Sequence, residues 1–396
     1  MMFFFKIIFE NIIKAIKKYF IITLLFALWL YRIDFIVADS AGFAKALQVI
    51  TIFGILLYTL HKKSNIISYS YNRTISPIKS LLFLYLYALI STLWAFMPTF
   101  AFFLSFQNLV LCFFLVWLFS NCKSFKSLEK TFLAIYAGIT LFELITVRIL
   151  YYPSVFIHYL SPATSSAICF SYCIAELLNM KIKDRKRRSY LKGAIVYSLI
   201  VLITCTSSGA NASAIFGLGT AFIFSGQFFY AFLIISIAVF LYLNPHLFDA
   251  FLLHIMPGKT METIESATGR TILWDIMIEL SNKKPIFGWG FGCIERAATA
   301  YGDIESPDAH NNYLGIYGSL GITGILILIY HFISAIIYNL KRRARLGFLG
   351  LLSAICCAML NGYSYGFLSG KACSITVVYF AIVVLSFYYS RVRVYE

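Results

Sequence analysis

Long apolar segments alternate with short polar segments along most of this chain. The apolar segments are about 17–25 residues long, the length that an α-helix needs to cross the hydrocarbon core of a bilayer. Their hydrophobic residues do not show the period-two alternation of barrel strands, so the pattern favours helices. We therefore expect an all-α polytopic membrane protein, in which each helix satisfies its own backbone. The predicted spans lie near residues 19–37, 41–59, 80–97, 99–120, 131–150, 163–180, 311–338, 347–368 and 372–390.

The apolar segment at 193–243 is long enough for two or three passes. A basic loop precedes it, a polar segment follows it, and the next span leads to another basic loop. Because basic loops mark the cytoplasmic side, an odd number of passes is expected here. Three short helices broken near Ser207–Gly209 and near Gly226–Gln227 fit best, and one pass plus a re-entrant hairpin is the alternative. The total is about twelve spans, with both termini in the cytoplasm.

The polar segment at 244–309, called the island below, interrupts the apolar pattern. We expect it to be one large extracytoplasmic loop between about the ninth and tenth spans. The predicted organisation has an amphipathic N-terminal segment at 1–18, spans one to nine at 19–243, the island at 244–309, spans ten to twelve at 310–390 and a cytoplasmic tail at 391–396. Reactive groups are expected in or beside the island, at the water–lipid boundary.

Composition agrees with this topology and excludes a soluble domain. Hydrophobic residues make up 60% of the chain and charged residues 13%, whereas soluble domains carry about 25% charged residues. The formal net charge of +16 would by itself suggest a nucleic-acid partner. The basic residues, however, cluster between apolar segments, as at Lys62-Lys63 and Lys341–Arg345. Such clusters are typical of cytoplasmic loops, so no nucleic-acid partner is expected.

The N-terminal segment and the cysteines add two expectations. Residues 1–18 are basic and amphipathic, which predicts a helix on the membrane surface, and no small-residue cleavage site is evident, which favours an uncleaved anchor. Most of the nine cysteines lie in apolar segments, and the island contains only Cys293, so the island cannot close a disulfide of its own. No cysteine or histidine spacing is typical of a zinc site.

Several motifs in and after the island resemble the core signature of a known family. They are Gly269-Arg270, Trp274, Pro285, Gly288, Gly290, His310-Asn311, Tyr313-Leu314 and Gly321-Ile-Thr-Gly324. In this combination they are similar to the O-antigen ligase/polymerase superfamily, whose members are polytopic glycosyltransferases of the GT-C type. The resemblance covers about residues 200–335 and agrees with the topology predicted for the whole chain.

The resemblance implies a reaction and a location. Members move a glycan from an undecaprenyl-diphosphate carrier to an acceptor hydroxyl at the periplasmic face of the bacterial inner membrane. Ligases use lipid A–core as the acceptor, whereas polymerases extend another lipid-linked repeat unit. The expected partners are therefore the lipid-linked glycan donor, the acceptor glycan and membrane lipid. The resemblance implies no nucleotide sugar, no cofactor and no metal.

The leaving group in such a reaction is a lipid diphosphate, so the site needs positive charge. Arg270 is permanently cationic and can bind phosphate oxygens in a bidentate way. Additional charge is expected from Lys259, Arg296 or Lys371. Family members often carry an arginine after a serine near the end of a mid-chain span, and the corresponding stretch around Ser208 lacks it. Ser208 and its neighbours are predicted to bind phosphate as neutral donors instead.

The reaction also needs a base and a sugar-binding surface. His310 is the candidate base for the acceptor hydroxyl, because imidazole titrates near neutral pH. Asn311 is expected to orient the imidazole or a sugar hydroxyl. Trp274 and Trp289 are candidates for stacking on sugar rings, and they are equally compatible with membrane-interface anchors.

Structural interpretations of the same residues stay open at this point. Arg270 also fits a cap or an ion pair within the island, and His310 also fits an interfacial polar residue at a helix start. Pro285, Gly288 and Gly290 favour a turn over substrate contact.

Three functions are consistent with the sequence. The favoured one is a metal-independent glycosyltransferase similar to the O-antigen ligases. The first alternative is an O-antigen or exopolysaccharide polymerase, which shares the same large loop. The second is a transporter or flippase for a lipid-linked sugar, which would place its polar site on broken helices near the bilayer midplane.

Overall fold

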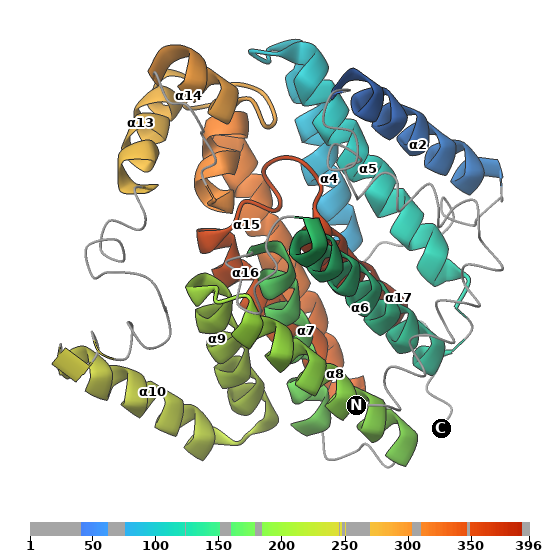
Figure 1. Cartoon of the computed structure of the whole chain (residues 1–396), viewed down its shortest axis with the longest axis vertical. Helices are drawn as coiled ribbons and strands as arrows, with labels where there is room; N and C mark the ends of the chain where they lie inside the picture. Colours follow the sequence, from blue (N-terminus) through green and yellow to red (C-terminus); the bar gives the residue numbers. More distant parts are fainter. Residues whose placement is uncertain are drawn as a thin grey trace.

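The computed structural model describes residues 41–61, 76–122, 124–150, 160–178, 184–244, 246–247, 250, 270–302, 310–346 and 349–389. Within these residues the chain forms helices and no strand (Figure 1), as predicted for an all-α protein. The helices are α2 (Ala41–His61), α4 (Pro77–Ile90), the 3₁₀ turn η2 (Ser91–Leu93), α5 (Pro98–Ser120), α6 (Phe125–Leu150), α7 (Leu160–Leu178), α8 (Arg185–Thr204), α9 (Ser208–Ser225), α10 (Phe228–Leu243), α13 (Arg270–Lys283), α14 (Ile294–Gly302), α15 (Asn312–Leu346), α16 (Gly350–Ser364) and α17 (Ser374–Tyr389).

The long apolar segment at 193–243 is divided by two helix breaks, and each has a local cause. Ser207 caps the start of α9, because its hydroxyl accepts a hydrogen bond from the Ala210 N–H at 3.4 Å. Gly226 ends α9 in the left-handed conformation, with φ of 80°. The two predicted breaks are therefore confirmed as the boundaries of α9. That each of these helices crosses a membrane stays a prediction.

Length and composition allow two of the described helical segments to cross a membrane, Pro98–Ser120 and Asn312–Lys341. Shorter apolar segments lie in α2, α4, α10, α16 and α17. Large apolar side chains are exposed on the outside, including Ile200 of α8 and Leu326 of α15, as expected for surfaces that face lipid. The total of about twelve spans and the cytoplasmic termini stay predictions, since residues 1–40 and 390–396 lie outside the described part.

A buried ion-pair network marks the end of the molecule where α6, α8 and α16 begin, called the basic end below. The Arg187 Nη2 atom lies 2.7 Å from Glu129 Oε1 and 2.6 Å from Glu176 Oε2. The Gly350 N–H donates to Glu176 Oε1 at 2.9 Å. Buried carboxylates in apolar helices are costly unless paired. Here Arg187 binds both Glu129 and Glu176, and the start of α16 binds Glu176 as well.

The opposite end, called the island end, carries α13 and α14 packed against α15 (Figure 1). Residues 284–293 enter a break in α15 at Gly321, whose φ of 67° and ψ of −165° are accessible essentially to glycine alone. The Trp289 N–H donates to the Gly318 carbonyl at 2.9 Å, and the Ile322 N–H donates to the Pro285 carbonyl at 2.8 Å. The predicted turn at Pro285–Gly290 is thus confirmed, and it fastens the island to α15.

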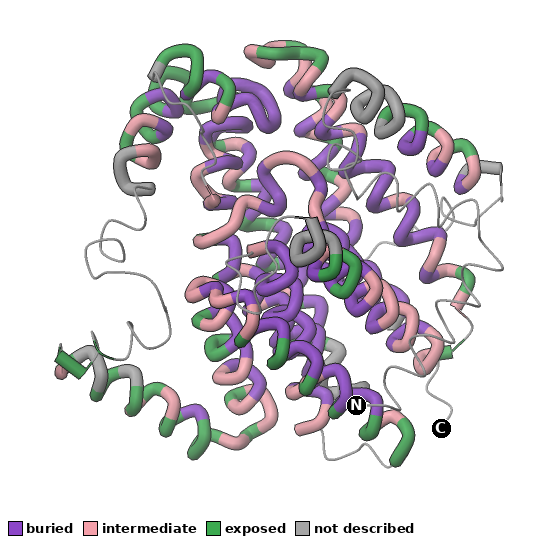
Figure 2. The backbone as a smooth tube through the Cα atoms, viewed as in Figure 1, coloured by how far each residue is buried: buried purple, intermediate pink, exposed green. Residues whose placement is uncertain are grey.

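A second irregular segment, the 365–373 loop, joins α16 to α17 at the island end. The predicted span at 347–368 was too long here, because α16 ends at Ser364. Phe367, Leu368, Ser369 and Ala372 of the loop are buried and its other residues are half-buried. The helix after it, α17, is buried along almost its whole length (Figure 2). By contrast, α10 leaves the bundle after packing against α9, and most of its side chains are exposed (Figure 2).

Candidate functional site

Three helix starts meet on the end of α16, at residues 363–366. The start of α15 arrives through His310, whose ring lies over Tyr365 with centroids 6.0 Å apart and planes inclined by 23°. The start of α13 arrives through Trp274, whose ring meets Tyr363 edge-on at 5.5 Å. The start of α9 arrives through Gly209, where an added Cβ would lie 2.3 Å from the Ser364 hydroxyl. Three segments far apart in sequence therefore border one short turn.

The two sequence candidates at the start of α15 have different surroundings. His310 has φ of 45°, a left-handed conformation that histidine adopts more readily than most residues. Asn311 is buried and caps α15, because its Oδ1 accepts from the N–H groups of Tyr313 at 2.9 Å and Leu314 at 3.1 Å. The carboxamide oxygen of Asn311 is therefore committed to the helix, and His310 is held directly before a fixed helix start.

Arg270 is the first residue of α13, one turn before Trp274. The described part of the structure does not include the Arg270 side chain, so its role in binding phosphate stays a prediction. Trp274 is partly exposed, and only an edge-on contact with Tyr363 is established for its ring. A sugar-stacking role for Trp274 is compatible with this position.

Ser208 is the first residue of α9 and follows the capping residue Ser207. Thr206, directly before the cap, has φ of 42°, which is strained for a β-branched residue. Thr206 and His310 are the non-glycine residues with positive φ in the described part, and each stands directly before a helix cap. The structure places Gly209, which follows Ser208, against Ser364, and it places His310 against Tyr365.

The remaining sequence candidates divide into two groups. The structure corrects the sugar-stacking prediction for Trp289, because this residue is 7% exposed and its indole N–H donates to the Leu280 carbonyl at 2.8 Å. Its ring packs against Phe96 and Tyr301. It has no free face for a sugar. Arg296 of α14 is exposed and lies 5.3 Å from the centre of the Phe100 ring. Lys371 lies in the 365–373 loop. Lys259 lies outside the described residues.

The cysteine of the island is not a nucleophile in this arrangement. Burial raises the pKa of the Cys293 thiol, and a hydrogen bond to the Met97 carbonyl and the charge of Arg296 lower it by less. The thiol therefore stays protonated near neutral pH. All nine cysteines of the chain are free, in agreement with the absence of a predicted disulfide framework.

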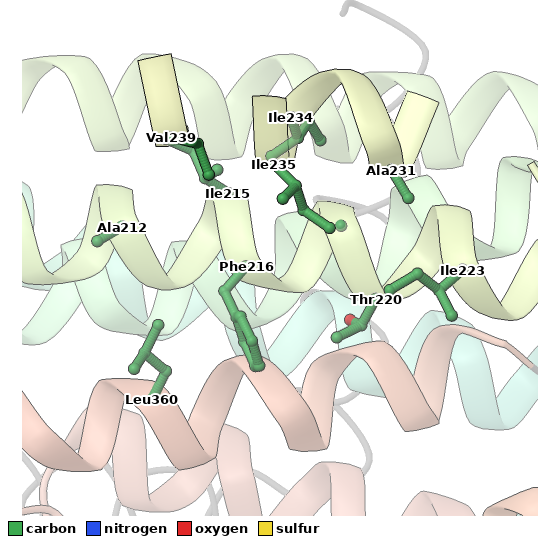
Figure 3. Close-up of a pocket in the computed structure, with 11 residues that line it drawn as sticks. Ala212, Ile215, Phe216, Thr220, Ile223, Ala231, Ile234, Ile235, Val239 and Leu360 are labelled. Carbon is green, nitrogen blue, oxygen red and sulfur yellow. The ribbon is translucent and has the colours of Figure 1, made fainter. Parts of the chain in front are cut away.

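An apolar groove of about 540 Å³ runs between α9 and α10, and Figure 3 shows the side chains that line it. Ala212 and Leu360 line it one helical turn from the candidate site, at the α9 start and near the α16 end. Ile223, near the end of α9, and Ala231, near the start of α10, line the groove at its other end. The other lining residues are Ile215, Phe216, Gly219, Thr220, Ile234, Ile235 and Val239. Thr220 is the one polar side chain among them, and its hydroxyl is bound to the Gly217 carbonyl at 2.7 Å.

Sequence reasoning missed Tyr363, Tyr365 and the loop that follows them. The glycines and serines between Gly362 and Ser374 were a signal for this loop. The sequence analysis assigned these residues to the ends of two spans, and so it did not predict that Tyr365 lies over His310.

Comparison with known proteins adds one finding. Residues 193–329 match the model of a protein family described as O-antigen ligase. A search of curated proteins found no match to this chain. The matched region includes α9, α10, α13, α14 and the first part of α15. It therefore covers all three helix starts that meet at the site, and every lining residue of the apolar groove except Leu360. It confirms the resemblance inferred from the motifs, and it gives the transporter interpretation no support.

Proposed function

We propose that this chain is an O-antigen ligase-like glycosyltransferase, and the match of residues 193–329 to a family described as O-antigen ligase supports the proposal. In this proposal it transfers a glycan from undecaprenyl diphosphate to a hydroxyl of lipid A–core, at the periplasmic face of the bacterial inner membrane. The family match supports lipid-linked glycans in general as substrates. Undecaprenyl diphosphate as the carrier and lipid A–core as the acceptor are part of the proposal. One observation carries the proposal: His310 stands where the starts of α9, α13 and α15 meet.

The converging helix starts suit a diphosphate leaving group. Each helix start carries a partial positive charge equivalent to about half an elementary charge, which favours a nearby anion. Arg270, the first residue of α13, would add a full charge. This arrangement supplies positive charge without the arginine that relatives often carry near Ser208. The proposed enzyme needs no metal for this step.

His310 supplies the other requirement of the reaction. As the acceptor hydroxyl oxygen attacks the anomeric carbon of the donor sugar, its proton passes to the imidazole. The bond between that carbon and the diphosphate oxygen breaks, and the electron pair leaves with undecaprenyl diphosphate. A positioned base of this kind contributes about 10²–10⁴-fold to the rate.

The apolar groove supports a lipid-linked donor. It follows α9 away from the helix start that borders the site, and its lining is apolar (Figure 3). An aliphatic chain attached to a diphosphate at the site has this surface beside it, and burial of its methylene groups favours binding.

The test compares His310→Ala and Arg270→Ala in cells that lack the chromosomal copy of this gene. We expect His310→Ala to lower glycan transfer by about 10²–10⁴-fold and Arg270→Ala by about 10²–10³-fold, with normal amounts of protein in the membrane. His246→Ala in the island and Arg185→Ala at the basic end are the matched controls, since both side chains are exposed. Normal transfer by both test variants would contradict the proposal.

Cells that lack the gene also distinguish a ligase from a polymerase, when their lipopolysaccharide and their undecaprenyl-linked glycans are compared side by side on gels. Long glycans that stay on the lipid carrier and fail to reach lipid A–core are expected for a ligase. Single repeat units on either lipid would instead identify a polymerase.

A further inference from the structure

The residue that ends α16 lies against the proposed base. Tyr365 is in an extended conformation, with φ of −154°, and its N–H donates to the Asn361 carbonyl at 2.9 Å. Its ring lies nearly parallel to the His310 ring, inclined by 23° with centroids 6.0 Å apart. Offset parallel stacking at this distance is a favourable aromatic arrangement.

The backbone of His310 is fixed, but its ring is not fixed by the helix. The αL conformation of His310 and the cap made by Asn311 determine where the Cα–Cβ bond points. His310 precedes α15, so no neighbouring helical turn restricts its side-chain torsions. Tyr365, from another segment, provides a flat surface against the ring and favours one ring orientation.

The segment behind Tyr365 is held by side chains from four helices. The Leu368 N–H donates to Asn312 Oδ1 at 2.6 Å, and the Leu368 carbonyl accepts from the Tyr85 hydroxyl at 3.2 Å. The Gly370 carbonyl accepts from Asn108 Nδ2 at 3.0 Å, and the Phe367 carbonyl accepts from the Thr376 hydroxyl at 2.8 Å. Because buried backbone groups are costly to leave unpaired, these bonds resist displacement of the loop.

We propose that Tyr365 is a positioning residue for His310, and that the hydrogen bonds of the 365–373 loop keep the Tyr365 ring against the His310 ring. The aromatic face orients the imidazole toward the acceptor hydroxyl, and it attracts the imidazolium that forms when the proton is transferred. Asn312 connects the two partners, since it belongs to the helix that His310 precedes and binds the loop that carries Tyr365. The inference rests on the proposed function, because it assigns a role through the base.

The experiment uses the full chain in lipid nanodiscs. The donor is undecaprenyl-linked glycan extracted from cells that lack the gene, and the acceptor is lipid A–core from the same cells. For Tyr365→Leu we expect kcat to fall about three- to thirtyfold, the range of a cation–aromatic contact, with the donor KM unchanged. Tyr365→Phe keeps the ring and is expected to stay within about twofold of the parent protein. Tyr330→Leu, on the exposed side of α15, is the matched control.

A second comparison tests whether Tyr365 acts through His310. In the His310→Ala background, Tyr365→Leu is expected to cause no further loss, because residues that act as a unit are not additive. Equal losses in both backgrounds, or a parent-like kcat for Tyr365→Leu, would overturn the inference and leave the proposed function in place. Full activity of His310→Ala alone would instead overturn the proposed base. If Tyr365→Leu does not fold, Tyr365→Met takes its place.

Discussion

Two irregular segments pack against α15, one at its internal break and one at its start, and their contacts differ in kind. Residues 284–293 bind α15 through main-chain hydrogen bonds to Gly318, Ser319 and Ile322, and their left-handed glycines allow the close approach. The 365–373 loop is bound instead through side chains, from Tyr85, Asn108, Asn312 and Thr376. Side chains also bind the first segment, since the Gly292 N–H donates to Ser319 Oγ and the Thr323 hydroxyl donates to the Ile286 carbonyl. Its close main-chain approach to α15, however, requires glycines, whereas the bonds named for the 365–373 loop come from side chains.

This difference separates the scaffold from the site. The 284–293 segment joins the island to α15 and buries Trp289, so it determines whether the island end forms at all. The 365–373 loop carries Tyr365, so it determines what lies against His310. Substitutions in the first segment should therefore act on folding, and those in the second should act mainly on transfer.

Gly321→Ala should have the largest effect. An added Cβ would lie 2.2 Å from the Ile286 carbonyl oxygen, in a backbone conformation that alanine does not adopt. Strain and overpacking together should cost about 2–6 kcal/mol of unfolding free energy, a large share of the stability of most proteins. Thermal unfolding in detergent and the yield of folded protein measure the loss. Gly219→Ala in α9 is the control, since its Cβ would meet nothing within 4 Å. Equal stability of the two variants would contradict the conclusion that the close approach of residues 284–293 to Gly321 stabilises the island end.

Asn312→Ala should have an intermediate effect on stability and a clear effect on transfer. It leaves the buried Leu368 N–H without its acceptor, which should cost about 1–3 kcal/mol. It also releases the loop that holds Tyr365, so the transfer rate should fall. Asn339→Ala is the matched control, because Asn339 is a buried asparagine of the same helix that bonds to Ala335 and Ser386 away from the site. If both variants lose stability and transfer in the same proportion, the separation between scaffold and site is wrong.

Gly370→Ala should have the smallest effect. Its added Cβ would meet nothing within 4 Å, and its φ is not positive. Both the unfolding free energy, within about 0.5 kcal/mol, and the transfer rate should match those of the parent protein. A marked loss would indicate that the 365–373 loop tolerates side chains as poorly as the 284–293 segment does, and the contrast between them would fail.

The helix pattern and its breaks were predictable because their causes are local. Ser207 offers a capping hydroxyl and Gly226 accepts a left-handed conformation, whatever surrounds them. The turn at Pro285–Gly290 follows in the same way from its proline and glycines. His310 was a sequence candidate because its residue type and place beside the island suit proton transfer, and its role stays a prediction.

The neighbours of His310 were not predictable, because they depend on pairings between distant segments. Tyr365 follows His310 by more than a helix length, and the loop that carries it is held by residues from four helices. Trp289 illustrates the same limit, since its indole suited a sugar in sequence but is buried by packing around Leu280. The periodicity of hydrophobic residues along the chain does not determine which helix faces pack against each other.

The sequence by itself determined the all-α class, the two breaks that bound α9, the polar island and its resemblance to a glycan-transferring family. Local backbone preferences and the run of apolar residues suffice for these, because each acts within a few residues of the chain. Only the tertiary structure decided that three helix starts converge on the end of α16 and that Tyr365 lies over His310. Those contacts depend on how whole helices pack, and packing is set by the sum of many weak contacts between segments far apart in the chain.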